Sequence, residues 1–162
     1  MDFTTADLCD AFPSVVQLAE PLFRSYGGLS HFSGAIEAIS VFEDNTLVQQ
    51  ALETPGHGRV LVVDGGGSLR SALLGGRLAT VAQVNGWAGV IIHGCVRDSV
   101  EISQVQVGIL ALNTSPRRSE KKGRGERGRP VTFAGVSFSP GHFVYVDPDG
   151  ILISDRNLLG TE

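Results

Sequence analysis

The stretch that decides the fold is RVLVVDGGGSLRSALLGGRLATVAQVNGWAGVII, which covers residues 59–92. It begins with an apolar run at residues 59–63, of the kind found in strands that are buried on both faces. Residues 77–84 have helical spacing, and Gly86 lies just past the expected helix end. A second apolar run at residues 88–92 closes the stretch. The order strand, glycine turn, helix, strand predicts a βαβ crossover and therefore a parallel sheet.

Patterns on either side of this stretch predict further elements. We expect a helix capped by Thr4 or Thr5, and another at residues 45–53 that is capped by Asp44. Further strands are expected at residues 34–42, 107–112, 131–138, 142–146 and 151–154, and a helical turn or two at residues 68–74. The turn sequence at residues 147–150, DPDG, makes the last two strands a hairpin. The sequence therefore predicts a mixed α/β domain, parallel in the middle and antiparallel late.

The composition is that of a globular protein with one domain, residues 1–162. Hydrophobic residues make up 42% and charged residues 19%, and the net charge of −4 argues against a nucleic-acid binder. Cys9 and Cys95 are too few for a metal cluster or a disulfide framework, so we expect two thiols in a reducing compartment. No secretory signal and no membrane span is visible, which predicts a cytoplasmic protein.

One segment, residues 115–130, differs in charge from the rest. It holds seven basic and two acidic residues, a net charge of +5, so the remainder of the chain carries −9. A solvated or subunit-bridging loop is one interpretation of this segment. A site for RNA, for an acidic partner or for an anionic ligand is the other, and the lack of interleaved aromatic residues weakens the RNA case.

Charged residues follow the second buried strand, at Arg97, Asp98 and Glu101. Arginine offers a planar, bidentate donor for an oxyanion, and aspartate is a hard oxygen ligand suited to magnesium or manganese. Glu101 lies three residues after Asp98, so it falls on the same side if a helix begins here. The alternative is an ordinary Arg97–Asp98 ion pair with Glu101 as a helix-start acid.

A glycine pair lies before the predicted helix of the crossover. Gly75, Gly76, Arg77 and Leu78 would provide backbone amides that have no acceptor within the helix. Such amides, together with the helix dipole, suit a carboxylate or a phosphate. Because ligands bind beyond the carboxyl ends of parallel strands, these amides and Arg97 should face one crevice.

Other catalytic arrangements have little support in the sequence. His93 could act as a base, but a lone histidine near a strand end is more often structural. The only lysines, Lys121 and Lys122, lie in the basic segment and not in an apolar strand. This placement disfavours an aldolase that uses a lysine Schiff base.

These features resemble one family, the class II 4-hydroxy-4-methyl-2-oxoglutarate aldolases and the RraA-like regulators of ribonuclease E activity. The resemblance rests on the pattern Gly76, twenty residues, Arg97-Asp98, two residues, Glu101. It also rests on three stretches, GGRLATVAQVNGWAGVIIHGCVRDSVEI, GERGRPVTFAG and SPGHFVYVDPDGILIS. Family members form an αββα-type domain, with mixed parallel and antiparallel sheets, similar to phosphohistidine swivelling domains. They assemble as trimers or pairs of trimers, with active sites between subunits.

The resemblance implies a divalent-metal-dependent enzyme. Its substrates would be 4-hydroxy-4-methyl-2-oxoglutarate and related 4-carboxy-4-hydroxy-2-oxo acids, cleaved to pyruvate and a second oxo acid, with oxaloacetate decarboxylated as well. Asp98 would hold the metal, Mg²⁺ or else Mn²⁺, and Glu101 would orient water at the metal. Arg97 would bind the pyruvyl oxygens, and the amides around Arg77 and Leu78 the substrate carboxylate.

Two positions bear on the choice between this enzyme and a second kind of family member: Asp98 favours the enzyme, and Gly76 counts the other way. Regulators that lack aldolase activity depart from Arg-Asp, whereas this chain keeps Asp98. Many aldolases have an aspartate at the position of Gly76, and that residue is thought to handle a proton. The alternative function is therefore a non-catalytic regulator that binds ribonuclease E or a helicase.

Overall fold

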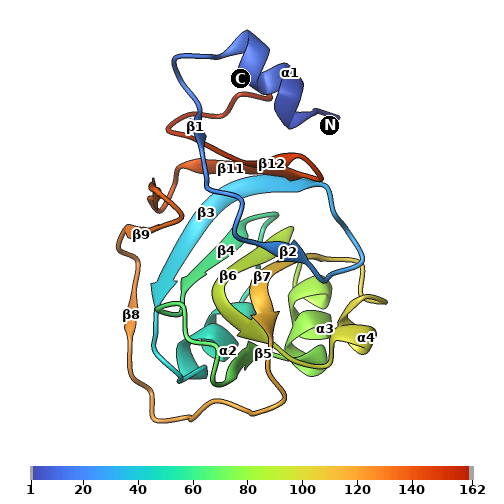
Figure 1. The fold of residues 1–162 in the computed structure, drawn as a ribbon, viewed down its shortest axis with the longest axis vertical. Coiled ribbons are helices and arrows are strands. Elements are labelled where there is room, and N and C mark those ends of the chain that lie inside the picture. The colour runs from blue at the N-terminus through green and yellow to red at the C-terminus, as the bar shows by residue number, and fades with distance from the viewer. Residues whose placement is uncertain (1, 161–162) are drawn as a thin grey trace.

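A continuous sheet, parallel in its middle and antiparallel at both ends, organises the computed structural model, which describes residues 2–160 (Figure 1). The helices are α1 (Thr5–Ala11), α2 (Thr46–Leu52), α3 (Gly76–Val84) and α4 (Ser99–Ile102). The strands are β1 (Gln17–Leu18), β2 (Arg24–Ser25), β3 (Phe32–Ser40), β4 (Val60–Asp64), β5 (Ala72–Leu74), β6 (Gly89–Val96), β7 (Gly108–Thr114), β8 (Glu126–Arg127), β9 (Val131–Phe133), β10 (Val136–Phe138), β11 (Phe143–Asp147) and β12 (Gly150–Ser154). This architecture confirms the predicted mixed α/β fold.

The long strand β3 joins the two kinds of pairing. The order along the sheet is β1-β12-β11-β3-β4-β6-β7-β2, with β8 paired to β3 and β5 paired to β6. The first residues of β3 pair antiparallel with β11, and residues from Ile36 onward pair in parallel with β4. Along β6, β4 pairs with the first half and β5 takes over at Cys95. Both β5 and the end of β6 therefore deliver their carboxyl ends to one edge.

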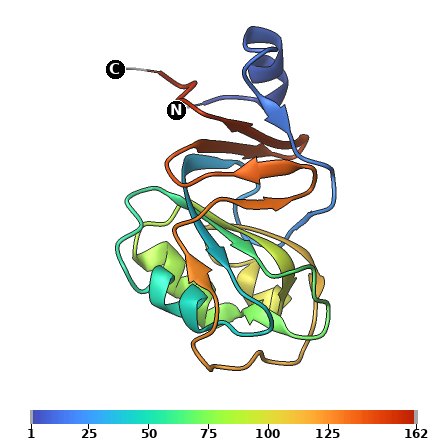
Figure 2. The same ribbon diagram turned by 90° about the vertical axis from the view of Figure 1, so that its left-hand side faces the viewer.

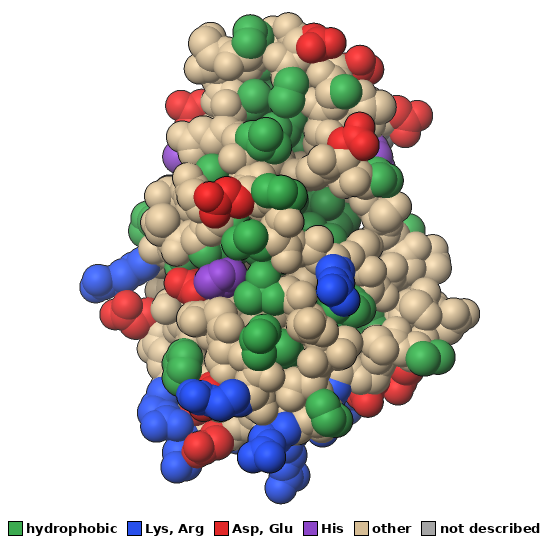
Figure 3. Space-filling model, in the orientation of Figure 1, with side chains coloured by type: hydrophobic (Ala, Val, Ile, Leu, Met, Phe, Trp, Pro, Cys, Tyr) green, Lys and Arg blue, Asp and Glu red, His purple; other side chains and the backbone are tan. Residues whose placement is uncertain are grey.

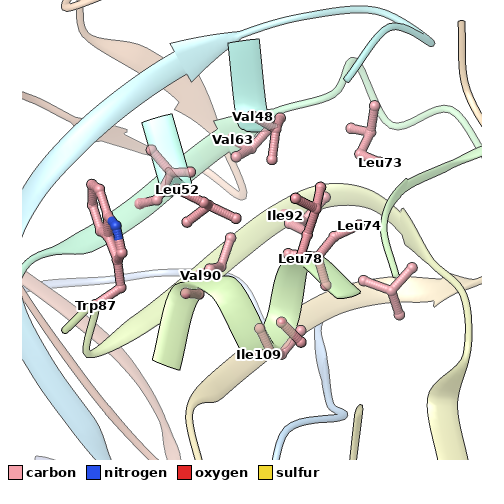
Figure 4. Packing of buried hydrophobic residues seen from close by; sticks show 14 of the residues in the cluster. Val48, Leu52, Val63, Leu73, Leu74, Leu78, Trp87, Val90, Ile92 and Ile109 are labelled. Atoms are coloured by element: carbon pink, nitrogen blue, oxygen red, sulfur yellow. The ribbon is translucent and has the colours of Figure 1, made fainter. Parts of the chain in front are cut away.

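The core lies on both faces of the parallel strands. On β4, Leu61 and Val63 belong to the cluster that packs under α2 and α3, which lie on one side of the sheet (Figure 2). Val60 and Val62 face the other way, toward the β9–β10 hairpin and β11. Figure 4 shows Leu78 of α3 among the strand side chains of the first cluster. Burying each such side chain contributes roughly 1.5–3 kcal/mol, so α3 is held in place by its apolar face.

Helix α1 sits at the far end of the molecule, beside the described C-terminal segment (Figure 1). Thr4 caps it, because its side chain accepts a hydrogen bond from the amide of Asp7. Thr5 then ties the helix to the sheet, since its amide and hydroxyl donate to the buried Asp147 carboxylate at 2.7 and 2.6 Å. The predicted cap is confirmed.

Two predicted elements are wrong. Residues 68–74 were expected to contain a helical turn or two, but Ala72–Leu74 form strand β5, because three buried aliphatic residues pair with β6. Residues 131–138 were expected as one strand. They form the hairpin of β9 and β10, with Ala134 and Gly135 at positive φ in the turn.

Among residues 2–160, none of the helices has the length and apolar character that crossing a membrane requires.

Candidate functional site

A cavity of about 200 Å³ opens where β5 and β6 end and α3 begins. Its lining residues are Asn45, Ala72, Leu74, Gly75, Gly76, Arg77, Leu78, Arg97, Asp98, Arg118, Ser119 and Lys121. The glycine pair, Arg77, Leu78, Arg97 and Asp98 are thus brought to one place, as the sequence predicted.

The glycine pair lets the backbone of α3 approach Asp98 closely. The amide of Gly76 donates to Asp98 Oδ2 at 2.9 Å. A Cβ atom at Gly75 would lie only 2.8 Å from the same oxygen, a contact that real Cβ atoms do not make. A side chain at Gly75 would therefore displace the carboxylate from the helix start.

The carboxylate of Asp98 is held on one oxygen only. Its exposed side chain accepts a single hydrogen bond among the described residues, from Gly76. The backbone of Asp98 is left-handed, with φ of 59°, a conformation that few residues other than glycine, asparagine and aspartate adopt readily. Asp98 thus keeps Oδ1 available to a ligand in a backbone geometry that costs free energy.

Arg97 and Asp98 do not form the ion pair that was the alternative interpretation. No carboxylate of residues 2–160 lies within 4.0 Å of the Arg97 guanidinium. Its hydrogen-bond partner is the carbonyl of Pro116, at 3.5 Å. The guanidinium therefore reaches the cavity with its charge uncompensated.

Glu101 lies on the same side as Asp98, as the spacing predicted for a helix beginning here. The short helix α4 contains it, and its carboxylate sits over Gly76. A Cβ atom built on Gly76 would overlap that carboxylate. Two carboxylates therefore flank one residue, Asp98 on its amide and Glu101 on its Cα side.

Asp98 and Glu101 fit a divalent cation that keeps several of its waters, and not one that is enclosed entirely by protein ligands. No group of three or more histidine, cysteine or acidic residues gathers within residues 2–160 to enclose a metal. Magnesium commonly keeps several waters and binds through one or two carboxylates. Asp98, with its open oxygen, and the neighbouring Glu101 match that requirement.

The start of α3 offers amides to an anion. Its N-cap is Gly75, which has no side chain to cap the helix. The first intrahelical bond runs from the amide of Ala79 to Gly75, so the amides of Arg77 and Leu78 precede the hydrogen-bonded ladder. These amides and the positive end of the helix dipole suit a carboxylate.

Three residues of the basic segment also line the cavity, whereas the sequence suggested an anion site only for the segment as a whole. After β7 the chain crosses the end of β6 and then runs along β5: the amide of Ser115 donates to Val96 and the amide of Ala72 to Arg117. This path brings Arg118, Ser119 and Lys121 to the cavity. The signal for it was the place of the basic segment directly after a parallel strand, where ligands bind.

His93 lies away from this cavity. Its ring stacks on Phe133 with centroids 4.8 Å apart, and its Nδ1 is 3.5 Å from Asp64 Oδ1. Because β6 extends to Val96, His93 is inside the strand and not at its exit. A packing role is consistent with this position.

Known proteins resemble the chain over nearly its whole length. A relative from Aromatoleum aromaticum is 55% identical over 98% of this chain and 100% of its own length, and one from Burkholderia multivorans is 52% identical over 98% and 99%. Both carry the provisional name 4-hydroxy-4-methyl-2-oxoglutarate aldolase.

Solved structures agree in fold but not in name. The RNA-processing inhibitor RraA from Thermus thermophilus has a TM-score of 0.95 and 46% identity, covering 100% of this chain and 98% of its own. A Geobacillus kaustophilus protein described as an S-adenosylmethionine:2-dimethylmenaquinone methyltransferase has a TM-score of 0.96 and 51% identity, covering 99% of both chains. The family model for RraA-like proteins, described as Aldolase/RraA, matches residues 5–153. The chain therefore belongs to the RraA-like family.

Proposed function

We propose that the chain is a divalent-metal-dependent aldolase that cleaves 4-hydroxy-4-methyl-2-oxoglutarate and related 4-carboxy-4-hydroxy-2-oxo acids. The products are pyruvate and a second oxo acid, and oxaloacetate is decarboxylated in the same site. The provisional names of the relatives support an aldolase. The observation that carries the proposal is the open oxygen of Asp98 beside Arg97, which pairs with no carboxylate of residues 2–160, in a cavity at the start of helix α3.

Both reactions break the bond between C3 and C4 of a 2-oxo acid. The electron pair of that bond moves toward the C2 carbonyl and gives the enolate of pyruvate, which then takes a proton at C3. The amides of Arg77 and Leu78 bind the C1 carboxylate and orient the substrate. The Arg97 guanidinium stabilises the negative charge that develops on the C2 oxygen.

A divalent cation, Mg²⁺ or Mn²⁺, would supply Lewis-acid stabilisation of the same charge. Asp98 would hold it through Oδ1, while Gly76 fixes the other oxygen at 2.9 Å. Glu101 would orient water beside it, from its position over Gly76.

The two reactions make different demands on a base. Aldol cleavage requires a group to take the proton of the C4 hydroxyl, whereas decarboxylation releases CO₂ without that transfer. Gly76 has no side chain for this task, and the carboxylate of Glu101 fills the space beside it. We therefore assign proton transfer in aldol cleavage to Glu101, directly or through water.

Pyruvate release from each substrate, with added magnesium and with EDTA, tests the proposal. We expect turnover of both substrates with magnesium and none with EDTA. Turnover that EDTA leaves unchanged would remove the metal from the mechanism. No turnover of either substrate with magnesium or manganese would overturn the proposed function.

The alternative function is a non-catalytic regulator that binds ribonuclease E or a helicase. Its support is the printed name of the Thermus relative and the basic side chains that gather at one end of the molecule (Figure 3). Metal-dependent turnover in the assay above would exclude a non-catalytic protein. Absence of turnover together with binding to a ribonuclease fragment would favour the regulator.

A closed assembly of three subunits, or of two such trimers, is the companion proposal. Light scattering across a dilution series, read beside specific activity, tests it. A monomer that keeps full activity would exclude a site shared between subunits.

A further inference from the structure

We infer that Arg118, Ser119 and Lys121 form a subsite for the second carboxylate of a dicarboxylic substrate, remote from the 2-oxo group. This inference rests on the proposed function and assigns a role to the segment that follows β7. Its basis is the distribution of unpaired charge around the cavity, a buried hydroxyl without a partner, and the way the segment is held.

Basic side chains in the cavity differ from many of those outside it. Lys122, Arg124 and Arg127 each lie within 4.0 Å of a carboxylate, on Glu120, Asp44 or Glu37. The cavity cations have no such partner among residues 2–160; they are Arg77, Arg97, Arg118 and Lys121. With Asp98 as the one acidic residue of the lining, the lining carries a net charge of +3.

That charge exceeds what a 2-oxo monocarboxylate needs. In the proposed mechanism the amides of Arg77 and Leu78 bind the C1 carboxylate, and Arg97 binds the C2 oxygen. A metal on Asp98 would add positive charge. Of the other three cations, Arg77 lies on α3 beside the amide site. Arg118 and Lys121, on the segment after β7, are left for a second anionic group, and a dicarboxylate carries one on the same molecule.

Two observations support a ligand on this side of the cavity. The Oγ atom of Ser119 is buried, and it has no hydrogen-bond partner among the described residues. Leaving such a hydroxyl unsatisfied costs free energy, which a hydrogen bond to a ligand oxygen would recover. Lys121 Nζ is held by the neutral oxygens of Asn45 and Gln49, at 3.0 and 3.1 Å, which orient the ammonium without cancelling its charge.

Asp44 is the positioning residue for this subsite. Its carboxylate accepts hydrogen bonds from the amides of Lys122 and Arg124 at 2.8 and 3.3 Å. The amide of Asn45 also donates to the carbonyl of Glu120 at 3.1 Å. The segment is thereby fixed against the start of α2, with Ser119 and Lys121 in the cavity wall.

The subsite has a kinetic signature in decarboxylation. The carboxylate of oxaloacetate that binds it is the one that leaves as CO₂, so its charge is lost in the transition state. Contacts to that group stabilise the bound substrate and not the transition state. The double variant Arg118→Gln/Lys121→Gln should raise the KM for oxaloacetate at least tenfold without lowering kcat.

Malate and lactate form a matched pair of probes, because they differ by one carboxylate and undergo no cleavage. Titration calorimetry with the intact protein should show that the double variant loses at least tenfold in malate affinity. Its lactate affinity should fall by less than threefold. Ser119→Ala should act in the same direction, whereas Lys122→Gln, the neighbouring lysine that pairs with Glu120, should change neither affinity.

The outcomes separate the subsite from the proposed function. Equal losses for malate and lactate, or an unchanged malate affinity, would overturn the subsite even if turnover is normal. Loss of malate affinity alone would support it even if no turnover is found. Titration of inorganic phosphate into the same proteins measures whether the basic residues bind a free anion instead of the carboxylate of a substrate. If the double variant lost phosphate affinity but kept its malate affinity, the inference would be overturned.

Discussion

Two aspartates near the starts of short helices, Asp44 before α2 and Asp98 before α4, have opposite surroundings. Asp44 is fully buried and accepts four hydrogen bonds, from the amide and hydroxyl of Thr46 and the amides of Lys122 and Arg124. Asp98 is exposed and, within residues 2–160, accepts one hydrogen bond, from the amide of Gly76. A carboxylate whose oxygens are already occupied by hydrogen bonds within the protein serves to hold the structure together. A carboxylate with a free oxygen can bind a ligand. The comparison therefore assigns architecture to Asp44 and chemistry to Asp98.

The variant Asp98→Asn tests the chemical role of Asp98, and we expect it to have the largest effect. Asparagine also tolerates a left-handed backbone, so the fold should survive. Asparagine keeps a side-chain oxygen but loses the negative charge that would hold a divalent cation, and we expect turnover to fall to the background of the assay. Oxaloacetate decarboxylation with magnesium and a thermal melt measure the two effects. Near wild-type activity would show that Asp98 does not hold a metal.

The next test compares an unpaired arginine with a paired one. Lysine at position 97 keeps the charge but loses the planar fork, so Arg97→Lys should lower kcat/KM by roughly tenfold to a hundredfold, or 1.4–3 kcal/mol. Arg127→Lys is the control, because Arg127 already pairs with Glu37 at 3.8 Å. Kinetics equal to wild type at position 97 would indicate a structural role there.

The sequence predicted one side of this comparison better than the other. Gly76, Arg97, Asp98 and Glu101 form a local motif on a βαβ unit, and the parallel sheet brings them together. Asp44 was predicted only as a helix cap, but the N-cap residue of α2 is Asn45. The role of Asp44 as an anchor was missed because the hydrogen bonds that it accepts from Lys122 and Arg124 span 78 and 80 residues. Sequence patterns of period two or 3.6 carry no information about such long-range pairs.

Strand β5 was missed for a related reason. Three residues are too short to show a strand period, and the nearby glycines and serines resemble a turn. Pairing with β6 determines the conformation of Ala72–Leu74, and that pairing is a tertiary effect. On the free edge of this short strand the amide of Ala72 donates to the carbonyl of Arg117, so missing the strand also hid the cavity wall.

Asp44→Asn tests the architectural half of the comparison. Burial alone would raise the pKa of Asp44, but the hydrogen bonds from Thr46, Lys122 and Arg124 outweigh it and lower the pKa from 3.8 to about 2. A carboxyl with a lower pKa in the folded chain stabilises it above pH 3.8, and the contribution disappears as pH falls toward 2. The shift corresponds to about 2 kcal/mol at pH 7.

Urea unfolding at pH 7, 5 and 3 measures this difference between the wild type and Asp44→Asn. We expect the free energy of unfolding of the variant to be about 2 kcal/mol lower than that of the wild type at pH 7 and pH 5. This gap in unfolding free energy should narrow at pH 3. The exposed Asp155→Asn is the matched control and should show no gap. A gap independent of pH would mean that lost packing, and not lost charge, destabilises the variant.

The smallest expected effect comes from Gly76→Ala, which acts on Glu101 and not on either aspartate. Alanine favours a helix interior over glycine by about 1 kcal/mol, but its Cβ would overlap the Glu101 carboxylate, which must then move. Glu101 is exposed and flexible, so the free energy of unfolding should change by no more than about 1 kcal/mol. Displacing a group that handles a proton should lower kcat for aldol cleavage by roughly threefold to tenfold.

Thr80→Ala, on an exposed position of the same helix, supplies the gain in helix propensity without touching Glu101. Equal loss of decarboxylation and aldol cleavage in Gly76→Ala would show that Glu101 serves the metal alone, since decarboxylation requires no base.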